Sequence, residues 1–104
     1  MLITTTEQIA GRDVAETLGV VQGSIIRSRS VVTDVGAGLK SIVGGEIRGY
    51  SQLIQDARKE ALERMTAEAT ELDADAVVGL RFTTSTVMQG ASEILAFGTA
   101  VKLR

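Results

Sequence analysis

The chain has 104 residues, of which 44% are hydrophobic and 23% are charged, and its net charge is –2 at neutral pH. This length and composition are typical of one globular domain, so we treat residues 1–104 as a single unit. The chain has no His and no Cys, which excludes disulfides, zinc fingers and Ser-His or Cys-His nucleophiles.

Neither a membrane nor a nucleic acid is an expected partner. No apolar run reaches the roughly 20 residues of a membrane span, and the first residues lack the basic and apolar regions of a signal peptide. Only Tyr50, Phe82 and Phe97 are aromatic, and acidic residues balance the basic ones. Nucleic-acid binding usually needs excess positive charge or several stacking side chains. We therefore expect a cytoplasmic protein that binds neither.

Strand-like segments precede a helical region in chain order. The sequence predicts a short edge strand at residues 2–6. It predicts a second strand at residues 14–27, where apolar and polar side chains alternate loosely. Residues 33–45 carry apolar side chains at helical spacing, which predicts a short helix that Gly36 and Gly38 weaken.

The clearest signal is a long helix over residues 46–72. Its apolar residues recur at steps of three or four and so form one stripe. They are Ile47, Tyr50, Ile54, Ala57, Ala61, Met65, Ala69 and Leu72. An unbroken helix of this length would reach about 40 Å, longer than a small domain is wide. We expect it either to bend near Gly49 or to project toward a neighbouring subunit.

Two further strands are predicted at residues 74–87 and 92–103. Both are rich in Val, Thr and Phe, and residues 88–91 between them suit a hairpin turn. The predicted fold class is therefore α+β, with an antiparallel sheet of three or four strands packed by one long helix and a short helix.

Both faces of these last strands carry apolar side chains. Alternation places Val78, Leu80 and Phe82 on one face, with Val77 and Val87 on the other. The strand at 92–103 is divided in the same way, with Ile94, Ala96 and Ala100 opposing Leu95, Phe97, Val101 and Leu103. One helix covers one face of such a sheet, so the other face needs another cover. A second copy of the chain is the simplest one, and a buried strand in a monomer is the alternative.

Glycines inside the predicted strands indicate bends or close approach of another backbone. They are Gly19, Gly79 and Gly98. Small residues flank Gly98 on its own face and form a shallow groove. We expect the long helix, through Ala57, Ala61 and Ala69, to pack into that groove, and a strand of a neighbouring subunit is the alternative.

Several blocks of the sequence together resemble the YbjQ family, small bacterial and archaeal proteins of unknown function that are sometimes labelled heavy-metal-binding. The blocks are Asp34 with Lys40-Ser41-Ile42-Val43-Gly44-Gly45, Tyr50, Ala57-Arg58, Ala74-Asp75-Ala76-Val77 and Gly98-Thr99-Ala100-Val101. The resemblance spans essentially the whole chain. It implies a subunit similar to that of dodecin and a ring-shaped homopentamer.

Two features of this chain depart from that family. Asp73 stands where the family commonly has Gly, just after the long helix, and Asp enters the left-handed region at modest cost. The second departure concerns metals, because the chain offers only thioethers and oxygens as ligands. Without thiolate or imidazole, tight binding of zinc, nickel or copper is not expected. We predict no metal site and no cofactor.

The segment around the start of the long helix is the candidate ligand site. Gly44 and Gly45 leave backbone N–H groups free for an anion, and Arg48 adds positive charge. A plain turn with Tyr50 packed inward is the alternative. The ligand-binding candidates are Asp34, Lys40, Gly44, Gly45, Arg48 and Tyr50.

Other motifs favour structural roles. Residues 36–41 resemble a phosphate loop, but Leu39 stands where a Walker A motif needs Gly. Asp73 and Asp75 lack the pattern of a calcium loop and fit a solvated helix end. Glu16 is the acid expected to be partly buried, with Arg81 as a suitable partner.

The leading functional hypothesis is a non-enzymatic homo-oligomer, expected to be a pentamer, with an inter-subunit or central cavity that binds a small ligand or ion. No catalytic residue is assigned. The rival hypothesis is an enzyme whose site assembles between subunits from Asp34, Arg48 and Tyr50. A third is an adaptor ring that binds another protein.

Overall fold

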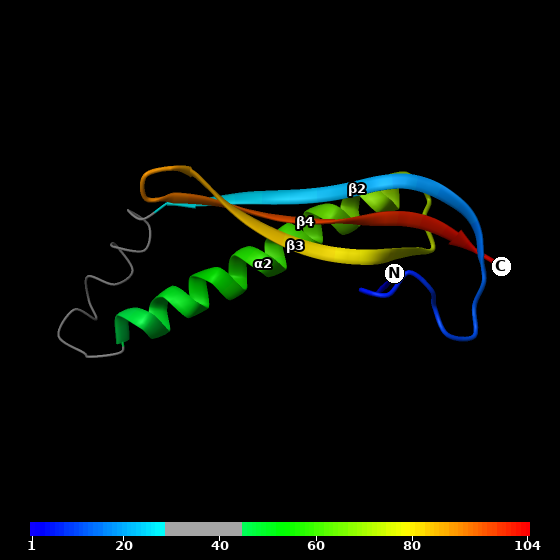
Figure 1. The fold of residues 1–104 in the computed structure, drawn as a ribbon, viewed down its shortest axis with the longest axis horizontal. Coiled ribbons are helices and arrows are strands. Elements are labelled where there is room, and N and C mark those ends of the chain that lie inside the picture. The colour runs from blue at the N-terminus through cyan, green and yellow to red at the C-terminus, as the bar shows by residue number, and fades with distance from the viewer. Residues whose placement is uncertain (29–44) are drawn as a thin grey trace.

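The computed structural model describes residues 1–28 and 45–104, with side chains for residues 1–28 and 51–104. Its elements are β1 (Leu2–Ile3), β2 (Val14–Ser28), α2 (Gly45–Glu71), β3 (Ala76–Met88) and β4 (Ala91–Leu103). Figure 1 shows the helix running obliquely beside the strands, with both termini at the same end of the molecule.

These elements agree closely with those predicted from the sequence. The helix α2 differs by one residue at each end from the predicted range 46–72, and it is unbroken at Gly49. Its first turns extend away from the strands (Figure 1). The short helix predicted at 33–45 lies outside the described residues, apart from Gly45 in α2.

The described strands form one four-stranded sheet in the order β1-β3-β4-β2. Strand β4 pairs antiparallel with both β2 and β3, as predicted. Strand β1, however, pairs parallel with β3, Leu2 lying opposite Ala76 and Ile3 opposite Val77. The sheet is therefore mixed, and the prediction of an antiparallel sheet was wrong at this edge. A two-residue strand is too short for its side-chain pattern to show its direction.

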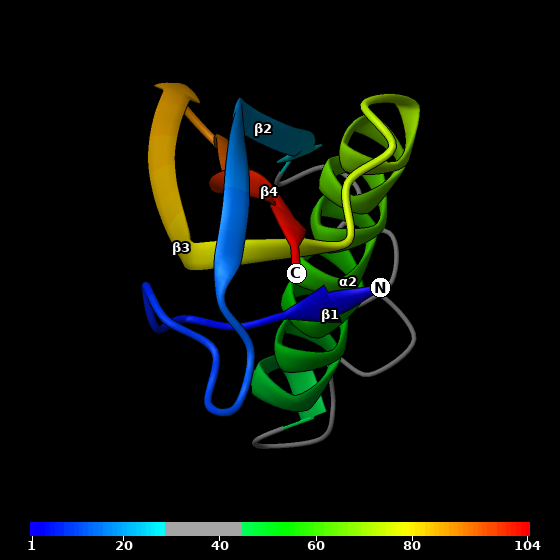
Figure 2. The same cartoon turned by 90° about the vertical axis from the view of Figure 1, so that its right-hand side faces the viewer.

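Helix α2 covers one face of the sheet, packing chiefly on β2 and β4 (Figure 2). Its buried residues are Ala57, Ala61, Met65 and Ala69, four of the predicted stripe. They pack with residues of the three long strands. These are Val21, Ile25, Val77, Ile94, Ala96 and Ala100. The small helix side chains allow a close approach, because a Cβ at Gly23 would collide with the backbone of Ala61 and Met65.

The space directly over Gly98 is filled by a neighbouring strand, whereas the flanking Ala96 and Ala100 pack with the helix. A Cβ at Gly98 would lie 2.7 Å from Cγ1 of Val77 and 3.1 Å from the carbonyl oxygen of Val78. The expectation that α2 packs on these small residues is confirmed at Ala96 and Ala100, whereas the atoms nearest Gly98 belong to β3 and the helix backbone lies against Gly23 of β2. Val77 reaches Gly98 because β3 and β4 are adjacent in the sheet.

A bulge in β3 changes which side chains share a face. The register with β4 shifts between Val78 and Arg81, and Gly79 adopts φ 65°. Leu80 consequently packs with the helix-side core that contains Val77, whereas Val78 belongs to the cluster on the opposite face. The prediction that Val78 and Leu80 share a face was wrong, because simple alternation assumes an unbulged strand.

The face opposite α2, here called the second face, is partly covered by the chain itself. Ala76, Val78 and Val101 are buried there, with Ile9 and Leu103 packed against them. Ile9 comes from the segment that joins β1 to β2. The chain thus supplies part of the cover that the sequence required. Farther along the same face, Val20 and Ile26 remain 72% and 57% exposed.

Candidate functional site

The residues predicted to bind a ligand lie at and before the start of α2. Asp34, Lys40 and Gly44 lie outside the described residues. Gly45, Arg48 and Tyr50 fall within the first two turns of the helix. Their common location at this helix end agrees with the sequence, but their use as a ligand site stays a prediction.

The described residues form a separate pocket on the second face. Its volume is about 510 Å³, within the range of roughly 300–1,000 Å³ that is usual for small-molecule sites. It is lined by Glu7, Val14, Thr17, Val78, Gly79, Arg81, Thr99 and Val101. Val78 and Val101 are buried residues of the apolar cluster on this face, whereas Glu7 and Arg81 are exposed.

Two bulges flank the part of β4 that lies in this pocket. In β3 the register shifts between Val78 and Arg81, and in β2 it shifts between Thr17 and Gly19. Thr99 of β4 is the partner of Val78, and the adjacent Val101 is the partner of Thr17. Bulges bend a strand and redirect its side chains, so both outer strands are distorted beside the same stretch of β4.

The β3 bulge places Arg81 on the second face and also binds the N-terminal segment. Nη1 of Arg81 donates to the carbonyl oxygens of Thr5 and Leu80, both at 2.8 Å. The backbone N–H of Gly79 donates to the carbonyl of Thr6 at 2.9 Å. These bonds fix the base of the Arg81 guanidinium, while its Nε and Nη2 make no hydrogen bond to any residue that the structure describes.

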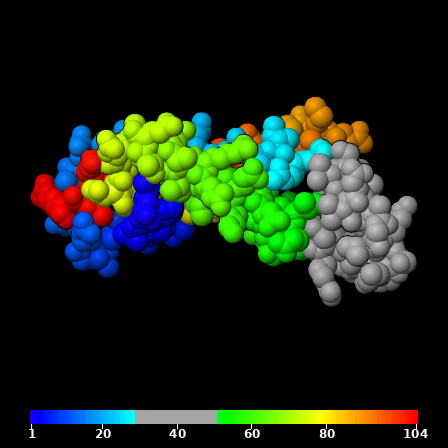
Figure 3. Space-filling model, turned by 180° about the vertical axis from the view of Figure 1, so that it is seen from behind, coloured from blue at the N-terminus to red at the C-terminus, as the bar shows by residue number. Residues whose placement is uncertain are grey.

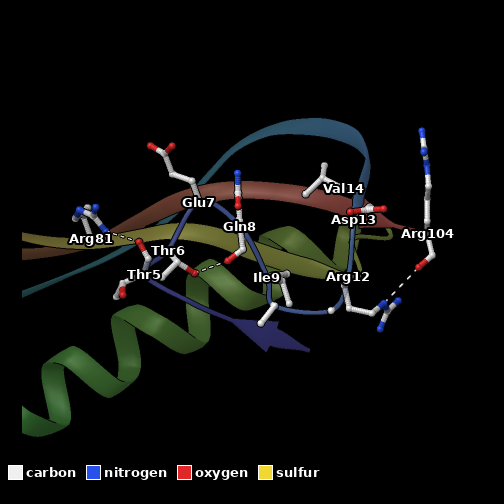
Figure 4. A pocket seen from close by; sticks show the side chains of 12 residues that line it. Thr5, Thr6, Glu7, Gln8, Ile9, Arg12, Asp13, Val14, Arg81 and Arg104 are labelled. Atoms are coloured by element: carbon white, nitrogen blue, oxygen red, sulfur yellow. Dashed lines mark hydrogen bonds between the residues drawn. The ribbon is translucent and has the colours of Figure 1, made fainter.

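A larger, open cavity of about 1340 Å³ adjoins the pocket, and the two share Glu7, Val14 and Arg81. Figure 4 shows Arg81 reaching from β3 to the Thr5 carbonyl at one end of this cavity. At the other end, Nε of Arg12 donates to the carbonyl oxygen of Arg104 at 3.3 Å. Most of the residues that line this cavity come from the segment between β1 and β2.

A second charged cluster lies along β2, between the strand and the helix. Glu60 bonds both Nη2 of Arg27 at 2.7 Å and Nη2 of Arg64 at 3.2 Å. Arg64 also donates through Nη1 to the carbonyl oxygen of Ser24 at 2.7 Å. Because this cluster joins α2 to the outer edge of β2, we interpret it as structural.

The acidic residues after the helix also have structural roles. Asp73 adopts φ 58°, so the left-handed turn expected at this position is present. Oδ2 of Asp75 accepts the N–H of Leu103 at 2.9 Å. Glu16, expected to be partly buried, is exposed, because it lies beyond the bulge in β2 at the open end of the sheet. In the part of the chain that the structure describes, no three acidic residues gather as a metal site would need.

The N-terminal and C-terminal residues gather at one end of the molecule (Figure 3). The lining of the larger cavity includes residues from both ends of the chain, among them Thr5 and Arg104. Within residues 1–28 and 45–104, no helix has the length and apolar character needed to cross a membrane.

A family model described as "Putative heavy-metal-binding" matches residues 1–104. The chain belongs to the YbjQ family. This membership confirms the resemblance drawn from the sequence blocks. The label describes the family model, and the residues of this chain provide no thiolate or imidazole to fit it.

Relatives named UPF0145 protein are similar to this YbjQ-family chain over nearly their whole length. One from Shewanella frigidimarina is 58% identical over 103 residues, covering 99% of this chain and 96% of its own. One from the archaeon Archaeoglobus fulgidus is 59% identical over 104 residues, covering 100% and 96%. One from Thermotoga maritima is 54% identical and covers 99% and 97%.

A solved structure shares the fold. It is a protein of unknown function from Pediococcus pentosaceus, assigned to the DUF74 family, with a TM-score of 0.60 and 17% sequence identity. The alignment covers 100% of this chain and 98% of the other. At this identity the similarity supports the α+β fold alone.

The sequence contained a partial signal for the second-face pocket. Gly19 and Gly79 were singled out as bends inside strands, and both lie at the bulges that border it. The sequence did not indicate that the two bends meet beside one stretch of β4, because that depends on strand pairing.

Proposed function

We propose that this protein is a non-enzymatic homo-oligomer, with five subunits as the family resemblance implies, and that a cavity between the subunits or at their centre binds a small ligand or ion. Under this proposal Asp34, Lys40, Gly44 and Gly45 border that cavity. Arg48 and Tyr50 are its other candidates.

The observation that carries the proposal is the position of the exposed apolar side chains. One set, the β2 patch, consists of Val14, Val20 and Ile26. The other, the hairpin patch, consists of Val87 and Met88 at the far end of β3 together with Phe82 in the middle of the strand. The two patches belong to strands near opposite edges of the sheet. A subunit with two different apolar surfaces suits head-to-tail contacts, which close into rings.

The outer edge of β3 also supports contact with a neighbouring subunit. Among the described strands, β1 pairs with β3 only at Ala76 and Val77. Residues 82–92 contain no charged side chain. Long uncharged edges are prone to pair with other chains unless something covers them. A neighbouring subunit would provide that cover in the oligomer.

The test is the mass of the particle in solution, measured by native mass spectrometry of protein purified from its own host. We expect a multiple of the 11.0 kDa subunit, together with any retained ligand. Val20→Lys and Met88→Lys should each lower the mass, because each places a charge in one of the two patches. Leu72→Lys adds the same charge to an exposed apolar residue outside both patches and serves as the control.

A particle of 11.0 kDa at micromolar concentration would contradict the proposal. Substrate turnover that is lost on changing Arg48 would favour an enzyme instead. Stoichiometric co-purification of one other protein would favour an adaptor.

A further inference from the structure

We propose that two copies of this chain join through the outer edges of their β3 strands, which pair antiparallel over residues 81–88. The contact is two-fold, so it differs from the head-to-tail contact proposed above. The inference rests on the proposed ring only for the number of subunits, since two rings joined in this way contain twice the subunits of one. The edge contact itself does not depend on the ring.

The pairing of the three long strands shows which backbone groups of β3 point away from the sheet. The backbone N–H of Gln22 donates to Oε1 of Glu68 at 3.4 Å, so the backbone groups of Gln22 point away from β4. Its partner Phe97 therefore directs its own groups toward β3, where it pairs with Arg81. These directions alternate along antiparallel strands, so every second residue after Arg81 directs its N–H and C=O groups outward. The residues that do so are Phe82, Thr84 and Thr86.

These outward groups have no partner among the residues that the structure describes. The N-terminal segment bonds this edge only as far as Leu80, whose N–H donates to the carbonyl oxygen of Thr4 at 3.0 Å. Figure 1 shows that segment beside the first half of β3, with the far half left open. Residues 82–92 carry no charge that would oppose a second strand. A long, uncovered and uncharged edge is a ready template for another strand.

The opposite edge of the sheet, along β2, is closed by side chains of α2. Glu68 accepts the N–H of Gln22, and Nη1 of Arg64 donates to the carbonyl oxygen of Ser24 at 2.7 Å. The first half of β2 is distorted by its two register shifts. Charged side chains and bulges are two of the features that keep edge strands from pairing with other chains. The strand that fits the open edge of β3 is therefore the β3 of a second copy.

The open stretch is complementary to itself. The N-terminal segment bounds it at one end and the hairpin turn after Met88 at the other, so two copies match about its middle, near Thr84. Antiparallel pairing then keeps the two Arg81 side chains at opposite ends of the contact, where they do not repel each other. The pairing uses backbone groups in the plane of the sheet. The side chains of the hairpin patch still project from its faces toward the head-to-tail neighbour.

The experiment removes one outward N–H and measures the mass of the particle by native mass spectrometry. Thr84→Pro lacks that N–H, and an edge strand tolerates proline where the N–H faces away from the sheet. We expect this variant to have half the wild-type mass, because the paired rings separate into single ones. Thr84→Ala shortens the side chain but keeps the N–H, so it should retain the wild-type mass.

Hydrogen exchange followed by mass spectrometry reports the strand pairing directly. In the wild type the amides of Phe82, Thr84 and Thr86 should exchange slowly, because the second strand accepts their hydrogen bonds. Thr84→Lys leaves every backbone group in place but brings like charges together across the contact, which is destabilising. It should speed exchange in residues 81–88 and leave exchange in α2 unchanged. Unchanged exchange in α2 shows that the subunit remains folded, and this variant decides the matter if Thr84→Pro does not fold.

The inference is overturned if folded Thr84→Pro keeps the wild-type mass, or if residues 81–88 exchange equally fast in the wild type and in Thr84→Lys. A ring that neither variant alters would support the proposed function and contradict this contact. A wild-type particle of two chains that Thr84→Pro reduces to one would support this contact and contradict the ring. A single chain of 11.0 kDa would contradict both.

Discussion

At the scale of single residues, two glycines in the sheet occupy places where a larger side chain would not fit. Gly23 lies under the helix backbone, and Gly98 lies under a methyl group of Val77. The sequence singled out Gly98 as a point of close approach, but it did not single out Gly23. The structure shows which element uses that space, a helix at Gly23 and a neighbouring strand at Gly98.

Gly98→Val should lower the free energy of unfolding by about 1–3 kcal/mol, because the added methyl groups overpack the contact with Val77. Chemical denaturation at low and high protein concentration measures this. The contact lies within one chain, so the loss should be equal at both concentrations. Ser92→Val, on the same strand at a half-buried position, is the control. Wild-type stability for Gly98→Val would show that Val77 moves aside without cost.

At the scale of elements, the helix is attached to the sheet mainly through small buried side chains. The ion pairs of Glu60 with Arg27 and Arg64 are partly exposed, and such pairs typically contribute no more than about 1 kcal/mol. The contact of Ala57, Ala61 and Ala69 with the strands excludes water completely. Close packing along this line therefore determines where the helix lies on β2.

Ala61→Leu should destabilise the protein by about 1–3 kcal/mol, because the helix cannot approach Gly23 with a larger side chain between them. Thermal unfolding followed by circular dichroism measures the effect. Ala67→Leu makes the same change on the exposed side of α2 and should alter stability by less than about 0.5 kcal/mol. Equal effects of the two substitutions would contradict the packing described here.

At the scale of the whole molecule, the amino-acid composition limits which metal ions the protein can bind tightly. The chain contains no Cys and no His, so its oxygens and thioethers are the only side-chain ligands for a metal ion. Thiolate and imidazole are the groups that hold zinc and nickel tightly in proteins. The description of the family model therefore does not extend to tight binding of these ions by this member.

Calorimetry at neutral pH should accordingly show no binding of zinc or nickel tighter than about 1 μM. A Lys59→His, Glu63→His double variant places two imidazoles one helical turn apart on the exposed side of α2. It should bind zinc more tightly than the wild type, which shows that the assay detects such a site. Stoichiometric submicromolar binding by the wild type would contradict the prediction.

The sequence by itself determined the long helix, the three long strands and the family. The stripe through Ala57, Ala61 and Met65 repeats at helical spacing over many turns, and such a signal does not depend on the rest of the chain. The family blocks, likewise, are a property of residue order alone.

Tertiary structure decided the direction of β1, the face on which Leu80 lies, and the pocket at Arg81. Each depends on strand pairing or on a backbone angle, and neither leaves a periodic pattern in the sequence. The bulge at Gly79 is the clearest case. One extra residue moves the side chains that follow it to the opposite face, up to the second register shift between Thr86 and Met88, and Arg81 is among them. Simple alternation therefore places Val77 and Val78 correctly and misplaces Leu80.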